Sequence, residues 1–62
     1  MKLVELVGYS HKPLFLSLDR IDGFTPDKIN EQQTIIFISR EEYYVNNTYQ
    51  EVIRRISNAQ EF

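Results

Sequence analysis

Cysteine is absent from the 62 residues of this chain, and histidine occurs once. The first absence excludes disulfide bonds and thiolate zinc sites. A single histidine leaves no dense metal cluster, and we expect no cofactor. A domain of this size buries only roughly 60% of its unfolded surface, so small domains usually need a disulfide, a metal or a partner subunit. We therefore expect one domain, residues 1–62, stabilised by a partner subunit.

Glycine is also scarce, since only Gly8 and Gly23 are present and they lie far apart. This spacing excludes a glycine-rich phosphate loop, and the sequence contains no nucleophile motif. The one histidine, His11, lies between Ser10 and Lys12 without an orienting partner of the kind that catalysis needs. We predict that His11 is a turn residue and that the protein is not an enzyme.

Neither sign of charge dominates, because the formal net charge is −2. The basic residues are scattered and outnumbered by acidic ones, so nucleic acid is not an expected partner. Long apolar runs are missing, which argues against a membrane-spanning segment. The first ten residues, "MKLVELVGYS", lack the features of a signal peptide. With no targeting segment and no cysteine, we expect a cytoplasmic protein.

Three aspartates surround the middle of the chain, at Asp19, Asp22 and Asp27. Carboxylate oxygens suit calcium and magnesium, but this spacing lacks the alternating ligands of a calcium-binding loop. Aspartate also caps turns through its side-chain oxygen. We predict the second role for these three residues.

Short apolar stretches predict strands over residues 2–7, 13–18, 20–25, 34–39 and 43–45. Gly8, which tolerates positive φ, and Pro13 interrupt the first two strands and indicate a hairpin. The stretch "TIIFIS" contains no polar residue between Ile35 and Ile38. Such a run is typical of a central strand that is covered on both faces.

A helix is predicted to begin after Thr48. Thr48 and Glu51 have the spacing of a capping box, in which the threonine hydroxyl accepts from the Glu51 amide. The Glu51 carboxylate would reach back to the Thr48 amide. Arg54 and Arg55 lie toward the C-terminal end, where the helix dipole favours cations. Apolar residues at helical spacing form a stripe that should pack on the sheet: Tyr49, Val52, Ile53 and Ile56.

These elements predict an α+β fold, a small and mostly antiparallel β-meander of four to five strands with one C-terminal α-helix packed on one face. One helix cannot cover both faces of such a sheet. If the helix covers the leucines of residues 14–18, the opposite face carries much apolar surface. We expect this second face to be an interface, formed by Val4, Leu6, Phe15 and Tyr44.

The order of these features resembles a family of very small bacterial proteins linked to flagellar motility, the FlbD or SwrD-like group. The similar stretches cover most of the chain: "LVELVG", "LFLSLDRID", "TPD", "TIIFI", "YYV" and "YQEVIRRI". The stretch "SREEYY" departs from the family, whose members tend to carry a glycine turn followed by lysines. The resemblance implies a small non-enzymatic bacterial regulator and transfers no catalytic residue.

The preferred hypothesis is a regulatory or protein-interaction module that acts as a homo-oligomer and binds an unknown protein partner. The alternative is a nucleic-acid-binding regulator, in which tyrosines stack on bases and arginines contact phosphates. A third hypothesis is a subunit that binds a small ligand between sheet and helix. Salt dependence separates the first two, because neutralising phosphates makes affinity fall steeply with salt.

Overall fold

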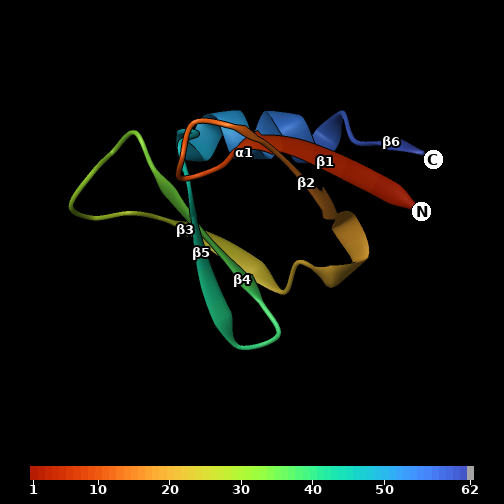
Figure 1. The fold of residues 1–62 in the computed structure, drawn as a ribbon, viewed down its shortest axis with the longest axis horizontal. Helices are drawn as coiled ribbons and strands as arrows, with labels where there is room; N and C mark the ends of the chain where they lie inside the picture. Colours follow the sequence, from red (N-terminus) through yellow and green to blue (C-terminus); the bar gives the residue numbers. More distant parts are fainter. Residues whose placement is uncertain (62) are drawn as a thin grey trace.

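The computed structural model describes residues 1–61. Within them, the elements follow in this order: β1 (Lys2–Val7), β2 (Pro13–Ser17), the 3-10 helix η1 (Leu18–Arg20), β3 (Gly23–Pro26), β4 (Thr34–Ile38), β5 (Glu41–Val45), α1 (Tyr49–Ser57) and β6 (Gln60–Glu61). The fold is α+β with antiparallel strands and a C-terminal helix, as predicted. The expected single sheet is divided in two over this part of the chain (Figure 1).

Sheet A has the strand order β2-β1-β6, and sheet B has the order β3-β4-β5. Figure 1 shows α1 alongside β1 and β2, with sheet B below them and crossing at an angle. The first strand, β1, begins beside β6 at one end of the molecule, where Lys2 pairs with Glu61 (Figure 1). The loop between β3 and β4 extends from the opposite end.

The register of sheet A decides which side chains share a face. Val4 pairs with Leu16, and Leu6 pairs with Leu14. Since directly opposed residues project to the same face of a sheet, these four lie on the core side. Val4 and Leu6 are each 1% exposed, so the prediction that they form an interface is wrong. Phe15 projects to the other face and is 56% exposed.

Sheet B is less completely covered than the sequence predicts. Thr34 and Ile36 of the central strand β4 are fully buried. Ile35 and Phe37 project to the other face and are only half-buried. The apolar run "TIIFIS" therefore does not mean that both faces are equally enclosed. One face of sheet B forms part of the core, and its outer face is partly open.

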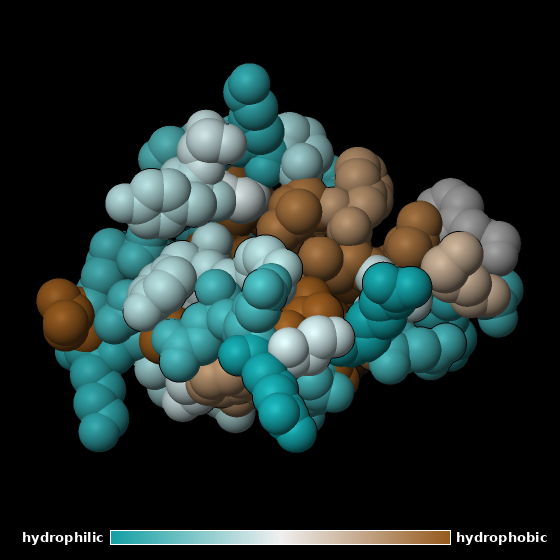
Figure 2. All heavy atoms as spheres, turned by 60° about the horizontal axis from the view of Figure 1, so that its bottom comes forward, coloured by the Kyte–Doolittle hydropathy of each residue, from teal (hydrophilic) through white to brown (hydrophobic). Residues whose placement is uncertain are grey.

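The core lies between the two sheets and α1. Its buried members are Val4, Leu6, Ile36, Val45 and Val52, and partly buried residues pack around them. Figure 2 shows apolar atoms reaching the surface in the middle of one face, with polar side chains around them. The core of this small domain is thus incompletely enclosed, as expected for a chain of this length.

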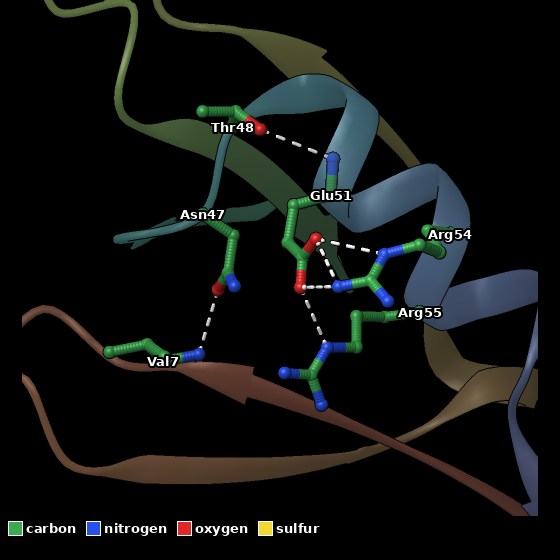
Figure 3. Close-up of polar contacts among 6 residues, drawn as sticks. All are labelled: Val7, Asn47, Thr48, Glu51, Arg54 and Arg55. Atoms are coloured by element: carbon green, nitrogen blue, oxygen red, sulfur yellow. Dashed lines mark hydrogen bonds and ion pairs between the residues drawn. The ribbon is translucent and has the colours of Figure 1, made fainter.

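Helix α1 confirms one half of the predicted capping box. The Thr48 hydroxyl accepts from the Glu51 amide at 3.2 Å. The Glu51 carboxylate instead accepts from Arg54 Nη2 at 2.6 Å and from Arg55 Nε at 2.9 Å (Figure 3). Because arginines three and four residues along a helix lie on the same side, they are close enough to bind Glu51. The predicted contact from Glu51 back to Thr48 is replaced by these ion pairs.

The apolar stripe of α1 is narrower than predicted. Val52 is fully buried, and Tyr49 and Ile56 are half-buried. Ile53 is 43% exposed, so its assignment to the packed stripe is wrong. The helix packs through positions 49, 52 and 56, and Ile53 lies beside this line.

The turn after β1 uses glycine for close packing and not for positive φ. The Gly8 amide donates to the Lys12 carbonyl at 2.7 Å, and the His11 amide donates to the Gly8 carbonyl at 2.9 Å. The positive φ of this turn, 65°, belongs to His11. A Cβ atom at Gly8 would lie 3.3 Å from the Lys12 oxygen. The prediction of a turn at Gly8 is therefore confirmed, and the expectation that Gly8 itself adopts positive φ is wrong.

The hairpin between β4 and β5 has an unusual turn sequence. Its two connecting residues, Ser39 and Arg40, both have positive φ, at 51° and 70°. Two-residue hairpin loops with two positive φ values normally contain Asn-Gly or Asp-Gly. Asp22 supports this turn, because its Oδ2 accepts from the Ser39 amide at 2.9 Å. A carboxylate from another part of the chain therefore helps hold a loop of unfavourable composition.

Candidate functional site

An open groove of about 740 Å³ lies between the turn after β1 and the strand β5. The first wall includes Tyr9 and Lys12 of the turn. The second wall is formed by Glu42, Tyr43 and Tyr44 of β5. We call this feature the tyrosine groove. The groove lies between the edge of sheet B and the turn that follows β1 in sheet A.

The tyrosines of this groove are well exposed. Tyr9 is 72% exposed, Tyr43 is 40% and Tyr44 is 41%. Tyrosine offers a large rigid apolar ring together with a polar hydroxyl, which is why it is common at protein interfaces. The fourth tyrosine of the sequence, Tyr49, is different, because its ring packs on Phe24 at a centroid distance of 5.4 Å. Tyr9, Tyr43 and Tyr44 form a surface, and Tyr49 supports the fold.

Of the four predicted interface residues, only Tyr44 lies in this groove. Val4 and Leu6 belong to the core. Phe15 lies in another, smaller groove, together with Arg54 and Arg55. The structure therefore does not bring the four residues together on one face.

Asn46 fixes the two walls of the groove to each other. Its backbone amide donates to the Val7 carbonyl at 2.7 Å. Its side-chain amide donates to the carbonyls of Gly8 at 2.9 Å and Tyr9 at 3.1 Å. Its side-chain oxygen accepts from Gln33 at 2.9 Å. One asparagine thus ties the end of β5 to the turn that carries Tyr9.

Asn47 makes a second connection between the sheets. Its Oδ1 accepts from the Val7 amide at 2.7 Å, as Figure 3 shows. Its backbone carbonyl accepts from the Thr34 hydroxyl at 2.8 Å. Asn47 is 6% exposed, and Thr34 is fully buried. We call Asn46, Asn47 and their partners Val7, Gly8 and Thr34 the asparagine seam.

The sequence interpretation did not identify this seam. The available signal was a pair of asparagines, Asn46 and Asn47, between a strand and a helix cap. Asparagine is common in turns because its side chain bonds to nearby backbone. Here the bonds to Val7 and Gly8 cross about forty positions of sequence, so a local pattern could not reveal them.

The charges of the groove are divided between its walls. Lys12 lies on the turn wall and Glu42 on the strand wall. Next to them, the Tyr43 hydroxyl donates to Glu41 Oε2 at 2.6 Å. This hydrogen bond, together with the negative charge of Glu41, raises the pKa of Tyr43 above its ordinary value. The carboxylates of Glu41 and Glu42 are the charged groups on the side of the strand wall.

The smaller groove, of about 330 Å³, lies between the outer face of sheet A and the end of α1. It contains Arg54 and Arg55, two of the four arginines of the sequence, all of which the nucleic-acid hypothesis made available to phosphates. Both are bound by Glu51, and hydrogen bonds from the two guanidinium groups lower the pKa of that carboxylate. The residues lining this groove include none of the tyrosines. The tyrosines, which the nucleic-acid hypothesis assigns to base stacking, therefore lie apart from Arg54 and Arg55.

The remaining polar candidates hold turns or lie at the surface. Asp27 Oδ1 accepts from the Ile29 amide at 2.9 Å, so turn capping is confirmed for Asp27. Asp22 instead bonds to Ser39, in a turn 17 positions along the sequence. Asp19 is exposed in η1, and His11 is exposed in its turn. Over residues 1–61, no group of three or more histidine, aspartate or glutamate side chains is arranged to hold a metal ion.

No protein-family model, curated protein or solved structure matches this chain. The resemblance to small motility-linked bacterial proteins therefore stays a prediction. Among the described residues, no helix has the length and apolar character needed to cross a bilayer.

Proposed function

We propose that this protein is a non-enzymatic interaction module that binds a protein partner through the tyrosine groove. The observation that supports this proposal is the exposure of Tyr9, Tyr43 and Tyr44 around one open groove. Aromatic rings at the centre of an interface contribute much of the binding energy. A regulatory role in the bacterial cytoplasm, expected from composition and resemblance, belongs to the same proposal.

The rigidity of the groove also supports this function. Asn46 bonds to the carbonyls of Gly8 and Tyr9 on one wall and directly follows β5 on the other. A turn whose backbone is held in place before binding loses less conformational entropy when the partner arrives. A groove with fixed walls can therefore bind more tightly than the same residues on a mobile loop.

Self-association, expected from the sequence, is a second form of this proposal with a different surface. Tyr44 lies opposite Ile35 on the outer face of sheet B, where Phe37 is also half-buried. A copy of the chain that covered this face would remove apolar surface from water, worth roughly 25 cal/mol per Å² before association costs. Sedimentation equilibrium with the wild type and Phe37→Glu tests this form separately, because Phe37 does not line the tyrosine groove.

Affinity capture from the native host, with a matched pair of variants, tests the main proposal. The double variant Tyr9→Ser/Tyr44→Ser removes two rings from the groove. The control Phe15→Ser/Ile53→Ser removes two exposed apolar side chains elsewhere. We expect a partner that the wild type and the control retain and the groove variant loses, with unchanged circular dichroism. A partner retained equally by all three proteins contradicts the proposal.

Nucleic acid is the competing partner, and a separate titration excludes or establishes it. Fluorescence anisotropy with single-stranded and double-stranded DNA and RNA should show no tight binding at physiological salt. The tyrosines of the groove and the pair Arg54 and Arg55 lie in different grooves, and Glu51 binds both of these arginines. Sub-micromolar affinity that falls steeply with salt would favour nucleic acid over the proposed partner.

A further inference from the structure

The loop between β3 and β4, residues 27–33, presents an isoleucine to solvent. Ile29 is 95% exposed, the highest value among the exposed large apolar residues of the described chain. Single apolar residues are common on protein surfaces, so exposure alone assigns no role to this side chain. The loop that carries Ile29 projects from the molecule, as Figure 1 shows, and its internal bonds and charges distinguish it from an ordinary surface loop.

Hydrogen bonds hold this loop in one shape. Asp27 Oδ1 accepts from the Ile29 amide at 2.9 Å. Asn30 Oδ1 accepts from the Gln32 amide at 2.9 Å. The Asp27 amide donates to the Gln33 carbonyl at 3.2 Å, and the Gln33 amide donates to the Asn30 carbonyl at 3.0 Å. Because a loop that is ordered in advance loses less entropy on association, Ile29 is well placed to make a contact with another molecule.

Residues of opposite charge flank Ile29 in this loop. Lys28 directly precedes it, Glu31 follows two positions later, and both are exposed. Among residues 1–61, neither Lys28 nor Glu31 takes part in an ion pair. The loop therefore offers an apolar side chain with a positive charge before it and a negative charge after it.

The tyrosine groove has the matching arrangement. Lys12 lies on its turn wall and Glu42 on its strand wall, with exposed tyrosines on both walls. Neither charged residue forms an ion pair within the part of the chain that the structure describes. An occupant that complements both walls carries one charge of each sign and an apolar side chain. The loop with Lys28, Ile29 and Glu31 has all three features.

The loop and the groove lie next to each other in the fold. Gln33 ends the loop and also lines the groove, where its side chain donates to Asn46 Oδ1 at 2.9 Å. Ile29 is not among the residues that line the groove of its own chain. A twofold rotation about an axis through this region brings the loop of each copy to the groove of the other. Such an arrangement is closed, so association stops at a dimer.

Resting on the function proposed above, we propose that the protein partner in the tyrosine groove is a second copy of this chain. Each copy places Ile29 among the tyrosines of the other copy. Lys28 then lies beside Glu42 of the second copy, and Glu31 lies beside its Lys12. The exchange is reciprocal, so the dimer contains two equal loop–groove contacts.

Sedimentation equilibrium of the full chain at micromolar concentrations tests this pairing. We expect the wild type to form a dimer. Ile29→Ser and Tyr9→Ser/Tyr44→Ser should each raise the dissociation constant at least about tenfold, because each removes apolar contacts from both halves of the interface. The control Ile53→Ser changes another exposed isoleucine, on α1, and should leave the dimer intact. Circular dichroism verifies that all variants fold, and equal weakening by Ile53→Ser overturns the assignment.

A mixture of the two weakened variants tests the exchange itself. Ile29→Ser keeps an intact groove, and Tyr9→Ser/Tyr44→Ser keeps an intact loop. Their heterodimer therefore has one complete loop–groove contact, whereas each homodimer has none. With a fluorescent label on one variant, sedimentation velocity should show tighter association than random pairing of the two variants predicts. A mixture that associates no better than its components overturns the exchange.

Charge swaps test the predicted pairing of Lys28 with Glu42. Lys28→Glu brings like charges together and should weaken the dimer, and Lys28→Glu/Glu42→Lys should restore it. The matched control Lys28→Glu/Glu5→Lys has the same net charge, but its new lysine lies in the smaller groove and should not restore the dimer. Equal recovery in both double variants overturns the charge assignment.

The remaining outcomes separate this inference from the proposed function. A dimer that Phe37→Glu dissociates and Ile29→Ser does not is formed by the outer face of sheet B, which overturns the loop–groove contact. Assemblies that grow beyond the dimer contradict the twofold arrangement. A monomer at all micromolar concentrations overturns the inference. In the capture experiment, the protein lost by Tyr9→Ser/Tyr44→Ser should be the untagged chain of the host, whereas loss of a different protein supports the proposed function and contradicts a second copy.

Discussion

The tyrosine groove and the asparagine seam include neighbouring residues of the chain that differ in solvent exposure. Tyr43 and Tyr44 are exposed, while the next residue, Val45, is fully buried and Asn47 nearly so. The polar groups of the seam bond to other parts of the protein, and the rings of the groove face solvent. The comparison separates residues that hold the two sheets together from residues that are available to a partner.

The two faces of sheet A provide the strongest test of this separation. Leu6→Ala should lower the free energy of unfolding by about 2–5 kcal/mol, because the side chain is buried in the core. Phe15→Ala, on the exposed face, should cost less than about 1 kcal/mol. Urea unfolding of both variants measures the difference. Similar losses would mean that the β1–β2 register, and with it the core, is misassigned.

Asn47 offers the next largest effect and tests the seam directly. Asn47→Ala leaves the Val7 amide without its partner in a buried setting, which should cost about 1–3 kcal/mol. The control is Asn30→Ala, which removes the same type of bond, to the Gln32 amide, at an exposed site. Water can replace that bond, so the control should lose less than about 1 kcal/mol. Equal losses in urea unfolding would remove the distinction between a buried seam and a surface turn.

In the turn formed by Ser39 and Arg40, replacing Arg40 with glycine should increase the free energy of unfolding. Arg40 has φ of 70°, a conformation that costs a non-glycine residue roughly 1–2 kcal/mol. Glycine avoids that cost but loses more entropy on folding, so Arg40→Gly should gain about 0.5–1 kcal/mol. Thermal unfolding measures the gain. Lys28→Gly, in an exposed loop position without positive φ, should bring no such gain, and a comparable gain there would point to a general effect of glycine.

The ion pairs of α1 predict a modest dependence of stability on pH. Hydrogen bonds from Arg54 and Arg55 lower the pKa of Glu51 in the folded protein. The folded state therefore binds the Glu51 proton less tightly than the unfolded chain does. This contribution is complete above the ordinary pKa of glutamate and is lost as pH falls through the lowered one.

Urea unfolding at a series of acidic pH values measures this dependence. Stability of Glu51→Gln should fall less between neutral and acid pH than stability of the wild type. The control is Glu31→Gln, in the loop between β3 and β4, whose profile should follow the wild type. Identical slopes for the wild type and Glu51→Gln would show that the exposed pairs contribute little.

Substitution of Tyr9 should have the smallest effect on the free energy of unfolding. It tests the comparison at a residue of the tyrosine groove. Its ring is mostly exposed in the turn after β1. Tyr9→Ser should change the free energy of unfolding by no more than about 0.5 kcal/mol. Thermal unfolding decides, and a loss as large as that of Asn47→Ala would place Tyr9 among the residues that hold the fold.

Local features of the fold were predictable because their causes lie within a few residues. The threonine cap of α1 depends on Thr48 and Glu51, three positions apart. The α+β class followed from short alternating stretches and one stripe of apolar residues at helical spacing. Turn capping by Asp27 involves an amide two residues away. In each case the sequence contained both partners of the interaction.

The candidate site was much less predictable. Of the four residues expected at an interface, Val4 and Leu6 are buried in the core, while Phe15 and Tyr44 are exposed in different grooves. The alternation along β1 was seen correctly, and only the pairing with β2 shows which of its two faces meets the leucines. A shift of register by one residue reverses the face of every side chain in a strand. Composition and spacing contain no direct measure of that register.

The sequence by itself determined most elements: the strands β1, β2, β4 and β5, the capped helix and the absence of cysteine chemistry. It did not predict η1 or β6, and it placed the third strand at residues 20–25 where the structure has β3 at Gly23–Pro26. Tertiary structure alone decided the division into two sheets, the burial of Val4 and Leu6, and the meeting of Tyr9 with Tyr43 and Tyr44. The physical reason is the range of the interactions. Asn47 bonds to Val7 across 40 positions of sequence, and this contact exists only after both sheets have formed. The groove depends on such long-range contacts, so its residues are adjacent in space without any local signal that pairs them.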